Sequence, residues 1–76
     1  MRLEKLQAYL RDKGQEYRYT EEDGCGSIDW ERRGLMYHVW EFPESCAESN
    51  VRIAGKMEEY KGNYEEQIIS IMEGWG

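Results

Sequence analysis

The chain has 76 residues, of which 16 are acidic and 10 are basic, so its formal net charge at neutral pH is -6. That length suits one small domain over residues 1–76, near the size at which a single core is marginal. Six tyrosines, three tryptophans and one phenylalanine supply large side chains for a core, which argues against a disordered chain. The acidic balance opposes binding to the phosphates of nucleic acids.

No stretch has the apolar core of a signal peptide or the length of a membrane span, so we expect a cytoplasmic protein that does not bind membranes. In a reducing compartment Cys25 and Cys46 are expected as free thiols, with one disulfide or a redox pair as the alternative. Two cysteines and one histidine at these spacings are too few for a zinc site. We therefore expect no metal and no cofactor.

In chain order, residues 2–13 come first and have an amphipathic helical pattern. Leu3, Leu6 and Leu10 fall on one helical face, and Gly14 follows the segment as a C-terminal glycine would. The leucine stripe is expected to pack against the core, with partner binding as the alternative. The sequence thus predicts a short helix before the first strand.

Three strands are predicted next, over about 16–21, 25–32 and 35–42. Asp23-Gly24 is a strong signal for a two-residue hairpin turn, and Arg33-Gly34 is a weaker one, because only its second residue adopts positive φ without cost. The two turns, placed independently, produce the same alternation of side chains. Pro43 ends the third strand because it lacks a backbone N–H donor. We predict an antiparallel three-stranded meander.

This register assigns each side chain to a face. One face is mainly apolar and aromatic, and helices should cover it: Tyr17, Tyr19, Ile28, Trp30, Leu35, Tyr37 and Val39. The other face carries Arg18, Thr20, Ser27, Asp29 and Glu31, followed by Met36, His38, Trp40 and Phe42. Because two amphipathic helices need one apolar sheet face, the second face has no helix to cover it.

Residues 43–62 carry the weakest pattern. The run from Asn50 to Ala54 allows a short fourth strand at the edge, and the alternative is a segment that lies across the sheet. The polar residues between Glu44 and Lys56 fit a capped turn, with a ligand site as the other reading. Asn63 followed by Glu66 resembles a capping box and predicts the start of a second helix. The apolar face of that helix is formed by Tyr64, Ile68, Ile71, Met72 and Trp75.

The predicted fold is a two-layer α+β domain in the order α-β-β-β-α, with both helices on one face of the sheet. This order resembles the layout of double-stranded-RNA-binding domains and of the small mRNA-cleaving toxins of HicAB toxin-antitoxin systems, which would imply binding or cleavage of RNA. Those toxins resemble one another in a Gly-Ser-His motif, for which this chain has Gly26-Ser27-Ile28. An RNA-directed protein is therefore the alternative function, opposed by the acidic charge and the missing histidine.

His38 is the only histidine, and the register places it opposite Asp29. We interpret Arg18, Asp29 and His38 as a polar row across three strands. Ser27 lies diagonal to His38, but a flat strand surface supplies neither the oxyanion hole nor the water-excluding pocket of a hydrolase. We expect no catalytic residues, and an enzyme is the less favoured class.

The second sheet face leads to the functional hypothesis. Its residues include types that are enriched in interface cores, and such exposed patches usually mark interfaces: Met36, His38, Trp40 and Phe42. We predict a non-enzymatic interaction or structural module that forms a homodimer, or binds another protein, through these residues. The intramolecular alternative is that Val51 and Ile53 fold over the patch.

Overall fold

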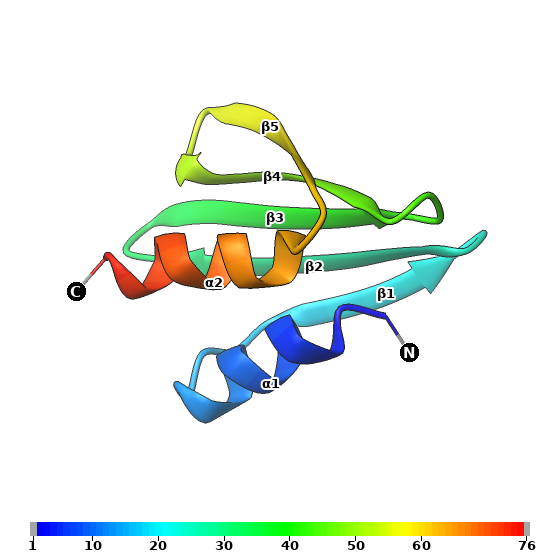
Figure 1. Cartoon of the computed structure of the whole chain (residues 1–76). Helices are drawn as coiled ribbons and strands as arrows, with labels where there is room; N and C mark the ends of the chain where they lie inside the picture. Colours follow the sequence, from blue (N-terminus) through cyan, green and yellow to red (C-terminus); the bar gives the residue numbers. More distant parts are fainter. Residues whose placement is uncertain (1, 76) are drawn as a thin grey trace.

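The computed structural model describes residues 2–75 as two helices and one five-stranded antiparallel sheet (Figure 1). The helices are α1 (Glu4–Asp12) and α2 (Tyr64–Glu73). The strands lie in the sheet in chain order and are β1 (Arg18–Glu22), β2 (Cys25–Arg32), β3 (Leu35–Phe42), β4 (Cys46–Ile53) and β5 (Lys56–Lys61). The predicted α+β layout with terminal helices is confirmed, but the sheet has five strands rather than three or four.

Both predicted hairpins are present in the predicted register. Tyr19 in β1 lies opposite Ile28 in β2, which lies opposite Val39 in β3. Each turn has two consecutive residues with positive φ, 52° and 78° in Asp23-Gly24 and 55° and 80° in Arg33-Gly34. This backbone geometry matches the right-handed twist of the flanking strands, and therefore keeps the two strands of each hairpin in register.

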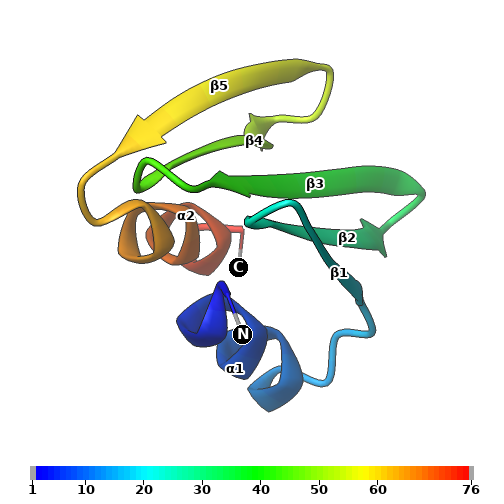
Figure 2. The ribbon, with the colours of Figure 1, turned by 90° about the vertical axis from the view of Figure 1, so that its right-hand side faces the viewer.

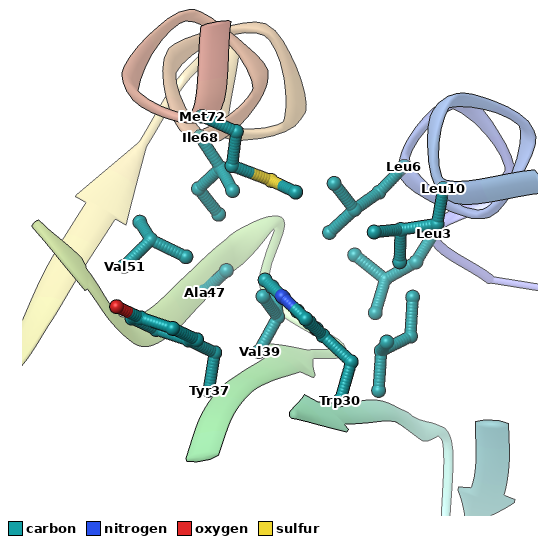
Figure 3. Close-up of a cluster of buried hydrophobic side chains, with 11 residues drawn as sticks. Leu3, Leu6, Leu10, Trp30, Tyr37, Val39, Ala47, Val51, Ile68 and Met72 are labelled. Carbon is teal, nitrogen blue, oxygen red and sulfur yellow. The ribbon is translucent and has the colours of Figure 1, made fainter. Parts of the chain in front are cut away.

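The two helices cover the same face of the sheet and form the core with it (Figure 2). The core contains Leu3, Leu6, Leu10, Ile28, Trp30, Tyr37, Val39, Ala47, Val51, Ile68 and Met72 (Figure 3). The three leucines of the predicted stripe are thus part of the core, as predicted, although Leu3 is the N-cap residue that precedes α1. Leu35 was expected to be covered by the helices with the rest of this face, but its side chain is 49% exposed. It is the first residue of β3, directly after the turn.

The prediction for residues 43–62 was wrong in detail, because they form the two full strands β4 and β5. A two-residue turn at Ala54-Gly55 joins them and places Ile53 opposite Lys56. The segment does not fold over the sheet face opposite the helices: Val51 is buried in the core on the helix side, and Ile53 is 46% exposed. The intramolecular explanation for the exposed patch is therefore excluded for the described chain.

The start of α2 follows the prediction, but its capping box does not. Asn63 occupies the N-cap position without a side-chain hydrogen bond to the helix. Glu66 instead accepts a hydrogen bond from Lys5, with 2.7 Å between Nζ and Oε2. Glu65 accepts one from the backbone N–H of Leu6 at 2.9 Å, and so satisfies a donor in the first turn of α1. The acidic residues of α2 therefore hold the two helices together.

A buried carboxylate, Glu41, links three parts of the chain under the helices. It is 5% exposed and accepts a hydrogen bond from Arg2 at 2.8 Å and another from the hydroxyl of Tyr64. Burial and the hydrogen bond to Glu41 raise the pKa of the Tyr64 hydroxyl. These contacts fix the N-terminal segment and the first residue of α2 to the end of β3.

Replacing Gly26 by alanine is expected to lower the free energy of unfolding by about 1–2 kcal/mol, because an added methyl group overpacks a filled site. Its Cβ would lie 2.8 Å from Cβ of Arg2, which is held in place by its own hydrogen bonds to Tyr19 and Glu41. Gly55→Ala is the matched control, since nothing lies within 4 Å of the added atom. Urea unfolding measures both variants, and an equal effect of the two would contradict the close approach at Gly26.

Candidate functional site

The surface opposite the helices, hereafter the open face, carries a line of aromatic rings along β3. His38 and Trp40 have their ring centroids 5.9 Å apart in an edge-on arrangement, and Trp40 and Phe42 are stacked at 5.8 Å. We call these three side chains the aromatic ridge. Trp40 is 44% exposed and the neighbouring Met36 is 60% exposed. The four residues predicted to bind a partner therefore lie on one strand and on one face, with large apolar groups open to solvent.

The predicted polar row is only partly formed. Arg18, Asp29 and His38 are cross-strand neighbours, and Nδ1 of His38 is hydrogen-bonded to Oδ1 of Asp29. An ionised carboxylate only accepts, so the imidazole donates through Nδ1. Within residues 2–75, Arg18 makes no ion pair with Asp29, and Ser27 makes no hydrogen bond with His38. The nucleophile-to-base contact that a serine hydrolase requires is therefore missing from the described face.

Two polar side chains from β4 hold β3 in place beneath the ridge. The amide oxygen of Asn50 accepts from the backbone N–H of His38 at 2.8 Å, and its nitrogen donates to the carbonyl oxygens of Met36 at 3.0 Å and Ala54 at 2.6 Å. The hydroxyl of Ser49 donates to the carbonyl oxygen of His38 at 2.7 Å. These bonds continue the link between β3 and β4 past the last backbone pair, Val39 with Ser49.

Sequence reasoning missed this role of Ser49 and Asn50. The strand register is irregular between Ser49 and Ile53, and both polar residues are buried. An asparagine inside a strand pattern was the only signal, because asparagine is depleted in regular strands and here substitutes for the backbone. The polar group between Glu44 and Lys56 is thus part of a strand pair, and neither a capped turn nor a separate ligand loop.

The open face has a different chemistry on each side of the ridge. One row across all five strands runs Thr20, Ser27, Trp40, Glu48 and Glu59. The next row contains Glu22 opposite Cys25 on β1 and β2, and Phe42, Cys46 and Lys61 on β3 to β5. In the Trp40 row the hydroxyl groups lie on the β1–β2 side and the carboxylates on the β4–β5 side. In the next row the acid lies at the β1 edge and the base at the β5 edge.

The two cysteines lie on either side of β3. On one side of β3, Cys46 of β4 is opposite Phe42. On the other side, Gly26 of β2 is opposite Glu41, and Cys25 directly precedes Gly26 in β2. Two strand spacings separate their Cα atoms by about 10 Å, which is beyond the span of a disulfide. Both are free thiols in this structure. A disulfide between Cys25 and Cys46 within one chain would require the sheet to rearrange.

Other site classes receive no support from the described chain. Across residues 2–75, no three potential metal ligands gather in one place. Neither α1 nor α2 has the length and apolar character needed to cross a membrane. Comparison of the chain with family models, with curated proteins and with solved structures returns no match. The exposed aromatic side chains of the open face are therefore the feature that marks the candidate site.

Proposed function

We propose that this chain is a non-enzymatic protein-interaction module that forms a homodimer through its open face. The observation that carries the proposal is the aromatic ridge with Met36 beside it, which no segment of residues 2–75 covers. Contiguous apolar patches on small soluble domains usually mark interfaces, and aromatic residues and methionine are enriched at interface cores. A domain of this size also gains stability when association buries more apolar area.

The distribution of polar groups supports a second copy of this chain as the partner. In a symmetric face-to-face dimer, a twofold axis parallel to β3 would place the β1–β2 side of one protomer over the β4–β5 side of the other. Thr20 and Ser27 would then face Glu59 and Glu48 of the other protomer, which pairs hydroxyl donors with carboxylate acceptors. At the next row Glu22 would face Lys61, which pairs opposite charges across the interface.

The other in-plane twofold axis, perpendicular to β3, is disfavoured by the same distribution. It would place β4 over β4 and β5 over β5, so that Glu48 and Glu59 would face their own copies. Like charges brought together at an interface cost free energy. The axis parallel to β3 also stacks Trp40 near its own copy, with the two sheets aligned and about 10 Å apart as in sandwich packing.

Light scattering on a sizing column is expected to give twice the mass of one chain, and the double variant Met36→Lys and Trp40→Ser is expected to give a folded monomer. The substitutions replace exposed side chains, so the helix side of the core is unchanged. Leu35→Ser is the matched control, since it removes an exposed apolar side chain of β3 that belongs to the other face of the sheet. A monomeric wild type, or a double variant that stays dimeric, would rule out the proposal.

A charge exchange tests the orientation of the dimer. Lys61→Glu alone should weaken association, and adding Glu22→Lys in the same chain should restore it, because the two positions face each other across the proposed axis. Lys56→Glu on the same strand serves as the control for net charge. If the second substitution weakens association further, the axis parallel to β3 is wrong.

A further inference from the structure

Both cysteines point to the open face, at the same level along β3. Cys46 is opposite Phe42, and Cys25 directly precedes Gly26, so Cys25 is level with Phe42 on the other side of β3. Gly26 and Ala47, the next residues in their strands, are buried on the helix side. Since neighbours in a strand point to opposite faces, the two thiols lie on the proposed interface, where both are partly exposed.

The proposed twofold axis brings each cysteine over the other cysteine of the second chain. Rotation about an axis parallel to β3 keeps the level of a residue along that strand and exchanges the β2 side with the β4 side. Cys25 of one protomer therefore faces Cys46 of the other protomer, and the symmetry creates this pair twice. Within one chain the same two thiols stay apart, because β3 lies between them.

The surface beside Cys25 is hollowed, which gives the facing strand room to approach. Packed sheets lie about 10 Å apart, whereas a disulfide joins Cα atoms that are about 4.4–6.8 Å apart, so the bond needs a local approach of the two sheets. A hollow of about 230 Å³ on the open face is lined by Thr20, Glu22, Asp23, Cys25, Ser27 and Trp40. Antibody domains likewise hold a disulfide between two packed sheets, beside a large aromatic ring.

We infer that Cys25 of one protomer and Cys46 of the other form a reversible disulfide, in two symmetric copies, when the dimer meets a low-molecular-weight disulfide such as oxidised glutathione. The bond rests on the proposed homodimer, since the axis parallel to β3 is what brings the two cysteines together. The dimer is then free to dissociate when the thiols are reduced and is covalently closed when they are oxidised. In a reducing compartment both cysteines remain thiols.

The bond forms by two exchange steps. The thiolate of one cysteine attacks a sulfur of oxidised glutathione, which forms a mixed disulfide and releases one glutathione thiolate. The thiolate of the facing cysteine then attacks the cysteine sulfur of the mixed disulfide, which forms the interchain bond and releases the second glutathione thiolate. The two cysteines lose two electrons to the oxidant, and their two protons pass to the released glutathione. Excess reduced thiol reverses both steps, because the bond remains partly exposed.

Oxidation of the full chain with glutathione disulfide tests the pairing. After the remaining thiols are blocked with iodoacetamide, most of the wild-type protein should run as a covalent dimer on a denaturing gel without reductant. Dithiothreitol should convert this dimer to single chains. A protease digest of the dimer band, analysed by mass spectrometry, should contain the peptide of Cys25 joined to the peptide of Cys46.

Single variants separate this pairing from unspecific oxidation. Cys25→Ser and Cys46→Ser should each run as single chains after oxidation, because the remaining thiols lie on opposite sides of the axis. An equilibrated mixture of the two variants should form a covalent dimer again, since a mixed dimer holds one facing pair. The matched control is Cys25→Ser with Ser27→Cys, which moves the thiol about 7 Å along β2. It should cross-link about tenfold less than wild type, because the shifted pair exceeds the span of a disulfide.

The inference is overturned if either single variant cross-links as well as wild type, if the mixture does not cross-link, or if the digest joins two like cysteines. Light scattering in the presence of reductant tests the homodimer separately. A reduced dimer that does not cross-link on oxidation contradicts the disulfide alone, whereas a reduced monomer contradicts both the disulfide and the proposed function. Both single variants should be dimers in reductant, which shows that the serine substitutions leave the interface intact.

Discussion

Replacing Asn50 by alanine is expected to lower the free energy of unfolding by about 3 kcal/mol, because three backbone groups lose their partner together. The side chain of Asn50 accepts from the N–H of His38 and donates to the carbonyl oxygens of Met36 and Ala54. A buried group left unsatisfied costs about 1–3 kcal/mol, and the total stability of a small domain is about 5–15 kcal/mol. Urea unfolding of the variant measures the loss.

The chain supplies its own control in its other asparagine. Asn63 stands at the N-cap of α2 but makes no capping hydrogen bond with its side chain. Asn63→Ala should therefore cost less than the roughly 1 kcal/mol that a working N-cap contributes. Equal losses at the two positions would show that the bonds of Asn50 are not what stabilises the junction between β3 and β4.

The loss of the Asn50 side chain should also affect the proposed dimer interface. Met36 and His38 flank the bulged part of β4, and their backbone groups are held by Asn50 rather than by a regular ladder. Hydrogen exchange at the amide of His38 should become faster in Asn50→Ala, because its acceptor is gone. A looser β3 presents the aromatic ridge less rigidly, so dimerisation should weaken even under conditions in which the variant remains folded.

The first half of the fold was predictable because local signals agreed with one another. The two turns at 23–24 and 33–34 each require positive φ at two positions, and both place the same residues on the helix side. A slip by one residue would have exposed Ile28 and Val39, which are fully buried. The same agreement predicts that Met36, Trp40 and Phe42 lie together on the open face.

The second half was not predictable from alternation, because the bulge interrupts it. In β4 three consecutive residues, Ser49, Asn50 and Val51, are buried, so a period of two is lost where the strand changes register. The edge strand β5 has four charged residues among its six, and its other two side chains, Met57 and Tyr60, do not alternate on one face, so the strand gives no periodic apolar signal. The acidic side of the open face and the role of Asn50 therefore emerge only once both strands are placed.

The buried polar contacts were also not predictable from the sequence. Arg2, Glu41 and Tyr64 are far apart in the sequence and have no pattern that links them, although together they join both ends of the chain to β3. Helix periodicity placed Tyr64 correctly on the inner face of α2. It could not indicate that the hydroxyl would meet a carboxylate, because that depends on how the helix crosses the sheet.

Tyr64→Phe is expected to lower the free energy of unfolding at pH 8 by about 2 kcal/mol, because the buried carboxylate of Glu41 loses the hydrogen bond that it accepts from the Tyr64 hydroxyl, while the ring remains in place. The variant should nevertheless lose less stability than wild type when the pH is raised. The pKa of Tyr64 is raised in the folded protein, first by burial and then by Glu41, above the ordinary value of 10.0. Above pH 10 the unfolded chain therefore releases a proton that the folded chain retains.

Stability from this group is fully present below pH 10 and decreases as the pH rises through the raised folded value. Wild type should therefore lose more stability between pH 8 and pH 11 than Tyr64→Phe does, and the two should become more alike at alkaline pH. Part of the loss should persist in the variant, because burial also raises the pKa of Tyr9, to about 12. Urea unfolding at the two pH values measures the difference. An identical alkaline loss in both proteins would mean that the Tyr64 hydroxyl is not buried against Glu41 in solution.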